Sequence, residues 1–146
     1  MADFNKIGLL AIRDNSILMC RKNNYTSKLI MPGGQIDPGE TEHECLVREV
    51  REELGANASI KNVEYFGTYV DKTASDDVSV DKTVQIRLFK AELLGHPIAS
   101  SEIIELVWFG PTGNQRDLSD IIRNKILPDL IARREVDWSA SSPPRN

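Results

Sequence analysis

Residues 34–56 read GQIDPGETEHECLVREVREELGA, a stretch that predicts one helix with clear start and stop signals. Thr41 suits the N-cap position, and Glu44 three residues later completes the capping-box pattern of a helix start. Gly55 suits the position just after the last helical residue. We therefore expect a helix over residues 42–54.

Three glutamates share one face of this expected helix, because Glu49, Glu52 and Glu53 are spaced at i, i+3 and i+4. Like charges at this spacing repel by roughly 0.2–0.5 kcal/mol per pair, and the helix dipole disfavours anions near the C-terminal end. A hard divalent cation that prefers oxygen ligands would reverse this penalty. An acidic helix face alone is usually just solvated, so the interpretation depends on the residues in front of it.

The charged and glycine positions of this stretch follow a fixed spacing. The order is Gly34, five residues, Glu40, seven residues, Arg48-Glu49-Val50, one residue, Glu52-Glu53, one residue, Gly55-Ala56. This order resembles the Nudix box, G-x5-E-x7-R-E-U-x-E-E-x-G-U, where U is an aliphatic residue. Every fixed position matches, although Ala56 is smaller than the usual last aliphatic residue, and Pro32-Gly33 resembles the family's lead-in.

The resemblance implies a magnesium-dependent hydrolase that cleaves a diphosphate bond. Glu49, Glu52 and Glu53 would then bind Mg²⁺, for which Mn²⁺ could substitute, together with the backbone carbonyl of Gly33. These glutamates, with Arg48, are also the expected catalytic residues.

The same resemblance gives supporting roles to the other box positions. Arg48 would orient the carboxylates by ion pairing. Glu40 would support the loop in front of the helix and reach the metal through water. Gly34 and Gly55 would permit the turns into and out of the helix.

A further carboxylate often joins this cluster in the family, from a loop before a late strand that ends in an aromatic pair. Residues 101–109, SEIIELVWF, fit that description. Glu102 is the first candidate for a metal ligand or general base, and Glu105 is the second. The general base stays open among Glu49, Glu53 and Glu102, and a plain surface glutamate is the alternative for residues 102 and 105.

The rest of the chain alternates short apolar runs with turn residues, which indicates an α/β (α+β) fold. Strands are expected at residues 6–13, 16–21, 60–70, 83–94 and 105–109. Residues 32–34 should break regular structure, and a second helix within residues 118–134 should kink or restart at Pro128. With the resemblance, this predicts one α/β/α sandwich with a mixed sheet over residues 1–138 and a flexible tail at 139–146.

Composition narrows the choice of partners. The 146 residues carry a net charge of -4, which argues against binding a long nucleic acid, since that needs a basic surface. A small nucleotide-like diphosphate remains compatible, because a bound cation can supply positive charge locally. Cys20 and Cys45 suit a reducing compartment. The chain shows neither a signal peptide nor a membrane-spanning run, so we expect a cytoplasmic protein without a membrane partner.

Substrate signals outside the box are weaker. The short chain favours a MutT-like nucleoside triphosphate pyrophosphohydrolase. The absence of proline between Pro38 and Pro97 counts against the ADP-ribose group, and the upstream motif of the coenzyme A group is missing. Leu29 stands where many MutT-like members have tryptophan. An aromatic base clamp must then come from Tyr25, Phe66, Tyr69, Phe89 or another residue.

Several alternatives stay open at this point. One is a pyrophosphatase acting on ADP-ribose, a dinucleotide or a nucleotide sugar. Another is a non-catalytic, nucleotide-sensing Nudix domain, and a third is an interaction domain whose acidic helix is coincidental. A homodimer is expected only by analogy.

Overall fold

The computed structural model describes residues 2–23, 26–77 and 79–138. The expected flexible tail at residues 139–146 lies outside them. The elements in chain order are β1 (Phe4–Leu10), β2 (Ile12–Arg13), β3 (Ser16–Lys22), β4 (Gly33–Gln35), α1 (Glu42–Leu54), β5 (Ser59–Lys72), β6 (Thr83–Leu94), β7 (Ile103–Phe109), the 3-10 turn η1 (Gln115–Asp117), the π-helical turn η2 (Ile122–Ile126) and α2 (Leu127–Ala132). Within the described ranges, none of the helices has the length and apolarity required to cross a membrane.

The strands form two sheets. The first has the order β4-β1-β6-β5, and its β1–β6 pair is parallel whereas the other two pairs are antiparallel, so the expected mixed sheet is confirmed. The second sheet, β2-β3-β7, is antiparallel. The single strand expected over residues 6–13 is wrong in one respect: it is interrupted at Ala11, where the chain passes from the first sheet to the second.

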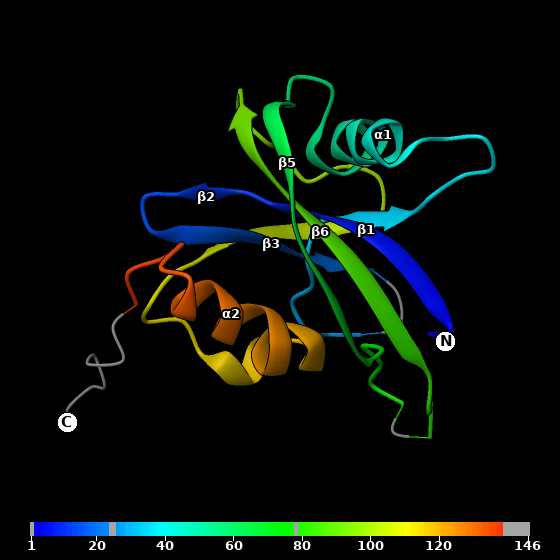
Figure 1. Ribbon diagram of the computed structural model, residues 1–146, viewed down its shortest axis with the longest axis vertical. Helices are drawn as coiled ribbons and strands as arrows, with labels where there is room; N and C mark the ends of the chain where they lie inside the picture. Colours follow the sequence, from blue (N-terminus) through cyan, green and yellow to red (C-terminus); the bar gives the residue numbers. More distant parts are fainter. Residues whose placement is uncertain (1, 24–25, 78, 139–146) are drawn as a thin grey trace.

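Helices cover both sides of these strands, as Figure 1 shows for α1 on one side and α2 on the other. Neighbouring residues of a strand point to opposite faces, so Leu9 and Leu18 pack on the α1 side while Leu10 and Met19 pack on the α2 side. All four side chains are fully buried. Both faces of the central strands are therefore apolar, which confirms the α/β/α sandwich.

Strand β4 contradicts the expectation that residues 32–34 break regular structure at two of the three positions, because Gly33 and Gly34 lie in the strand and only Pro32 lies outside it. It pairs antiparallel with β1, with Gly33 opposite Gly8. Gly33 has φ 142°, and a Cβ there would lie 2.0 Å from the carbonyl oxygen of Ile7, so only glycine allows this close pairing. The pairing fixes the start of the Nudix-like segment against the sheet.

The second helical region is interrupted as expected. A π-helical turn, Ile122–Ile126, precedes α2, and the N–H of Leu127 donates to the carbonyl of Ile122. Pro128 follows directly and has no N–H to donate, so the wider turn accommodates the proline without ending the helix.

Helix α1 begins with the expected capping box. The Thr41 hydroxyl accepts from the Glu44 N–H at 3.1 Å, and the Glu44 carboxylate accepts from the Thr41 N–H at 2.9 Å. Gly55 ends the helix at φ 92°. The sequence alone thus determines both ends of the helix that carries the acidic face.

Thr41→Ala should lower the free energy of unfolding by about 1 kcal/mol, because it removes the acceptor that satisfies the Glu44 N–H. Thr41→Ser keeps the hydroxyl and should stay close to the wild type. Urea denaturation followed by circular dichroism measures both. An equal loss in the two variants would show that the hydroxyl does not stabilise the helix start.

Candidate functional site

The three box glutamates open onto one cavity of about 430 Å³. Glu49, Glu52 and Glu53 reach it from the last turns of α1, Gly34 from β4 and Glu102 from the loop before β7. The remaining lining residues are Lys6, Lys22, Gln35, Asp37 and Ser101. Five carboxylates therefore surround this space, which we call the acidic cavity.

Glu53 is the deepest of these carboxylates, with 5% of the residue exposed. One carboxylate oxygen accepts from the Gly33 N–H at 2.8 Å, and the other pairs with the Lys22 ammonium at 3.0 Å. Burial raises the pKa of Glu53, while Lys22 and the Gly33 N–H act in the opposite direction. Gly33 thus contacts the site through its N–H, and its carbonyl as a metal ligand stays a prediction.

Glu49 fits against β4 because Gly34 has no side chain. A Cβ on Gly34 would lie 2.4 Å from the Glu49 carboxylate. Gly34 lies within β4, so its expected role in a turn is wrong and its real role is to leave room for this carboxylate. Burial raises the pKa of Glu49, and the ion pair with Arg48 opposes that rise.

Arg48 connects the loop in front of α1 to the glutamates. Its guanidinium binds both oxygens of Glu40, at 2.7 and 3.0 Å, and one nitrogen also donates to Glu49 at 2.9 Å and to Glu52 at 3.2 Å. Glu40 in turn accepts from the Asp37 N–H at 2.8 Å, which closes the loop. This geometry supports the positioning roles expected for Arg48 and Glu40.

The two candidates for the additional carboxylate differ in place. Glu102 lines the acidic cavity with the box glutamates. Glu105 instead pairs with Arg21 across β3 and β7, at 2.7 Å, on an exposed part of the sheet. The structure therefore favours Glu102 over Glu105.

Two lysines in this site were missed by the sequence analysis. Lys6 in β1 and Lys22 at the end of β3 both line the acidic cavity. No motif surrounds either lysine, and only the pairing of their strands brings them to the box. They place positive charge where a phosphate would meet the glutamates.

The donor set fits a divalent cation in its chemistry. Carboxylates exceed ammonium groups along the acidic cavity, and oxygen ligands are what Mg²⁺ prefers. Among the residues that the structure describes, no three acidic, histidine or cysteine side chains converge closely enough to hold an ion as they stand. Arg48 and Lys22 occupy the carboxylate oxygens instead, so these cations neutralise the site in the geometry seen here.

The expected aromatic clamp is not formed by the described candidates. Phe66 lies under the Arg133 guanidinium, Tyr69 donates to Asp129 and Phe89 packs edge-on against another ring. Tyr25 lies outside the described residues. The three described aromatics therefore stabilise the fold rather than face the acidic cavity.

Fold and site together define a class: α/β/α sandwiches whose first helix presents a Nudix box to a cavity beside the mixed sheet. A model of the NUDIX domain family matches residues 5–130, which is most of the chain. The chain belongs to the Nudix family.

Known relatives agree with this assignment. A Mycobacterium tuberculosis protein, provisionally named 8-oxo-dGTP diphosphatase 2, is 32% identical over 78 residues, 53% of this chain and 50% of that protein. The ADP-ribose pyrophosphatase of Methanocaldococcus jannaschii is 38% identical over 53 residues, 35% of this chain and 31% of that protein. This chain thus aligns with half or less of either relative.

A solved structure extends the match in fold to most of the chain. The MutT NUDIX hydrolase of Burkholderia pseudomallei superimposes with a TM-score of 0.66 at 20% identity, covering 80% of this chain and 90% of that one. At this identity the likeness concerns the fold alone.

The Glu40–Arg48 pair predicts a pH dependence of stability. The hydrogen bonds from Arg48 lower the pKa of Glu40 from 4.5 to about 2. A carboxyl whose folded pKa is depressed stabilises the fold above its ordinary pKa and stops doing so as the pH falls through the folded value. The gap in unfolding free energy between wild type and Glu40→Gln should be largest near neutral pH and close between pH 4.5 and about 2.

Urea denaturation at a series of pH values, in metal-free buffer, measures this gap. Glu44→Gln is a control for another glutamate near the helix start. A gap between wild type and Glu40→Gln that stays constant down to the acid limit would contradict the assigned role of the ion pair.

Proposed function

We propose that this chain is a magnesium-dependent hydrolase that cleaves a diphosphate bond of a nucleoside diphosphate derivative, with a nucleoside triphosphate as the first choice. One observation carries the proposal: the acidic cavity joins Glu49, Glu52 and Glu53 to two lysines from neighbouring strands. Such a site can hold metal ions and a polyphosphate together.

Glu49, Glu52 and Glu53 would hold the cation, and Arg48 would keep Glu49 and Glu52 oriented from the other side. When bound, Mg²⁺ neutralises diphosphate oxygens and lowers the pKa of bound water. Lys6 and Lys22 would pair with phosphate oxygens of the substrate. Lys22 would exchange its contact with Glu53 for one with phosphate, so the buried glutamate becomes available to the cation.

The reaction is hydrolysis of a diphosphate bond; for a nucleoside triphosphate this is the bond between the α and β phosphates, so a nucleotidyl or a pyrophosphoryl group moves to water. A water oxygen forms a bond to phosphorus as the bond from phosphorus to the bridging oxygen breaks, and the bridging oxygen keeps the electron pair. A carboxylate in the cavity accepts the water proton. Glu102 is suited to this task because it lines the cavity, and Glu49 and Glu53 remain alternatives.

The relatives support a nucleotide substrate without selecting one. The name of the Mycobacterium tuberculosis protein points to an oxidised triphosphate, and that of the Methanocaldococcus jannaschii protein to ADP-ribose. ADP-ribose cleavage is therefore the second candidate function. A nucleotide-sensing role, a cytoplasmic location and a homodimer stay predictions.

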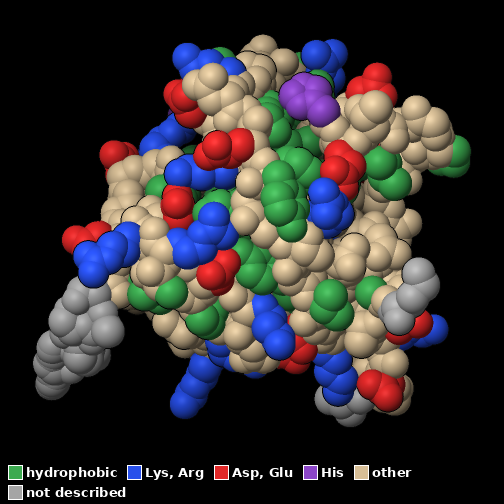
Figure 2. Space-filling model, in the orientation of Figure 1, with side chains coloured by type: hydrophobic (Ala, Val, Ile, Leu, Met, Phe, Trp, Pro, Cys, Tyr) green, Lys and Arg blue, Asp and Glu red, His purple; other side chains and the backbone are tan. Residues whose placement is uncertain are grey.

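The net charge of -4 supports a small substrate over a long nucleic acid. Figure 2 shows basic and acidic side chains interspersed over one face of the molecule, rather than a continuous basic band. Phosphate-backbone binding depends on clustered positive charge. The proposed partner is accordingly a single nucleotide.

A substrate panel tests the activity directly. The protein is incubated with Mg²⁺ and with nucleoside triphosphates, oxidised triphosphates, ADP-ribose, dinucleotides and nucleotide sugars, and the products are separated by chromatography. We expect a nucleoside monophosphate and pyrophosphate from a triphosphate, and no turnover in EDTA. Binding without any metal-dependent product across the panel would favour the sensor.

Replacing single box carboxylates tests their roles. Glu52→Gln and Glu53→Gln should each lower kcat/KM by about a hundredfold or more, because each removes a charged ligand without changing size. Glu105→Gln is the matched control, since Glu105 pairs with Arg21 outside the acidic cavity and should leave kcat/KM unchanged. Steady-state kinetics at saturating Mg²⁺ measure all three. Unchanged turnover in both Glu52→Gln and Glu53→Gln would exclude the proposed site.

A further inference from the structure

The loop between β6 and β7, residues 95–102, is bound to the end of α1 through its backbone. The N–H of Ile98 donates to the carbonyl of Leu54 at 2.9 Å, and the N–H of Ser100 donates to the carbonyl of Glu53 at 3.1 Å. These carbonyls belong to the last turn of the helix, where the helix itself has no donor left for them. The loop therefore takes its position directly from the residue whose carboxylate lies deepest in the acidic cavity.

A tight turn leads from this anchor to Glu102. The N–H of Ile103 donates to the carbonyl of Ser100 at 3.1 Å, which closes a four-residue β-turn. On the other side, the Glu102 carbonyl accepts from the N–H of Asn23 at 3.0 Å, directly after the end of β3. The backbone of Glu102 is thus held between the end of α1 and the end of β3.

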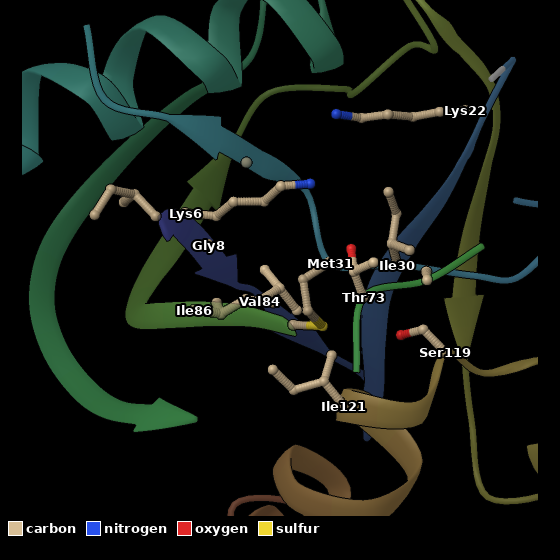
Figure 3. A pocket seen from close by; sticks show the side chains of 13 residues that line it. Lys6, Gly8, Lys22, Ile30, Met31, Thr73, Val84, Ile86, Ser119 and Ile121 are labelled. Carbon is tan, nitrogen blue, oxygen red and sulfur yellow. The ribbon is translucent and has the colours of Figure 1, made fainter. Parts of the chain in front are cut away.

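The end of β3 has a second contact with the site. Figure 3 shows the Lys22 side chain extending inward from this strand end, and its ammonium group pairs with the Glu53 carboxylate at 3.0 Å. The next residue, Asn23, binds the backbone of Glu102. Glu53 and Glu102 are therefore connected twice, once through the backbone of Ser100 and once through the end of β3.

Ser101, at the second position of the turn, has a left-handed backbone. Its φ is 59°, a conformation that is uncommon for residues with a side chain. The residue is exposed, so packing of its side chain does not account for this conformation. Backbone in a sparsely populated region persists only where surrounding contacts determine it, and such residues are frequent at functional sites. The contacts here are the hydrogen bonds on either side of the turn.

We propose that Ser101 is a positioning residue, whose left-handed backbone turns the chain so that Glu102 lines the acidic cavity. The inference rests on the proposed function, in which a carboxylate of this cavity accepts a proton from water. An extended or right-handed backbone at this position would redirect the chain after Ser100 and break the turn that the Ile103 N–H closes. Glu102 would then leave the cavity, while the glutamates of α1 stay in place.

Two substitutions separate the backbone of Ser101 from its hydroxyl. Ser101→Gly removes the hydroxyl and adopts a positive φ freely, whereas Ser101→Thr keeps the hydroxyl but is branched at Cβ and disfavours this conformation. Ser101→Thr should lower kcat by about fivefold or more and leave KM unchanged, since kcat follows the fraction of molecules that hold the turn. Ser101→Gly should keep most of the turnover. Steady-state kinetics in Mg²⁺, with the best substrate of the panel, measure both.

A double-mutant cycle shows whether Ser101 acts through Glu102. Glu102→Gln should itself lower kcat by about a hundredfold, as expected for loss of a general base. In this background Ser101→Thr should lower kcat by less than about twofold, because the carboxylate that it misplaces is already gone. An equal loss from Ser101→Thr in both backgrounds would show a purely structural role and overturn the proposal.

Arg134→Thr is the matched control. Arg134 has the same φ of 59° and is also exposed, but it follows α2 and lies outside the acidic cavity. The substitution introduces the same unfavourable backbone and should leave kcat unchanged. A loss of kcat as large as that of Ser101→Thr would mean that any strained turn has this effect, which contradicts a positioning role for Ser101.

Amide hydrogen exchange tests the turn without metal or substrate. The N–H groups of Ile103 and Asn23 should exchange about fivefold or more faster in Ser101→Thr than in the wild type, because both bonds depend on the turn. Ser101→Gly should keep their protection. Unchanged exchange in Ser101→Thr overturns the proposal, and so does a loss of kcat in Ser101→Gly as large as that in Ser101→Thr.

The two proposals fail in different ways. Hydrolysis with the same kcat in wild type and Glu102→Gln keeps the proposed function, with Glu49 or Glu53 as the base, and overturns the role given to Ser101. A wild type that hydrolyses no nucleotide overturns the proposed function, and the amide exchange of Ile103 then decides whether Ser101 holds the turn.

Discussion

Burying the carboxylate of Glu53 is the constraint on which the site depends. An ionised carboxylate removed from water costs several kcal/mol unless it is paired and hydrogen-bonded. The fold meets this cost with an N–H from Gly33 in β4 and an ammonium group from Lys22 in β3. Three separate stretches of chain must therefore meet at the end of α1, and the two sheets bring them together.

The parts of the molecule that follow local rules could be predicted from the sequence. The bounds of α1 came from Thr41, Glu44 and Gly55, and the capping bonds are formed as expected. The mostly alternating apolar residues of 83–94 predicted a strand, and β6 has the same bounds. The spacing of the box residues predicted the family. It also predicted that Glu49, Glu52 and Glu53 lie together, because positions i, i+3 and i+4 of a helix share a face.

What could not be predicted depends on contacts between distant segments. Lys6 and Lys22 have no surrounding motif, and only strand pairing brings them beside the glutamates. The run Pro32-Gly33-Gly34 has the composition of a turn, but Gly33 and Gly34 lie in the edge strand β4, since the missing side chain at Gly33 permits close pairing with β1. Gly34 leaves room for the Glu49 carboxylate, because a side chain at this position would collide with it. The sequence rules for turns could not predict this contact.

The acidic helix face is unfavourable by itself, and the fold stabilises it from two sides. Arg48 binds Glu40, Glu49 and Glu52 from the loop side, and Lys22 binds Glu53 from the sheet. Arg48 is tied to Glu40 by two hydrogen bonds, so it remains in place as a permanent support. Lys22 lines the acidic cavity and pairs with Glu53 at 3.0 Å, and in the proposed function it would exchange this contact for one with a substrate phosphate. The protein thus folds with these carboxylates neutralised by Arg48 and Lys22, and on the proposed function Glu53 would become available to a metal when a nucleotide binds.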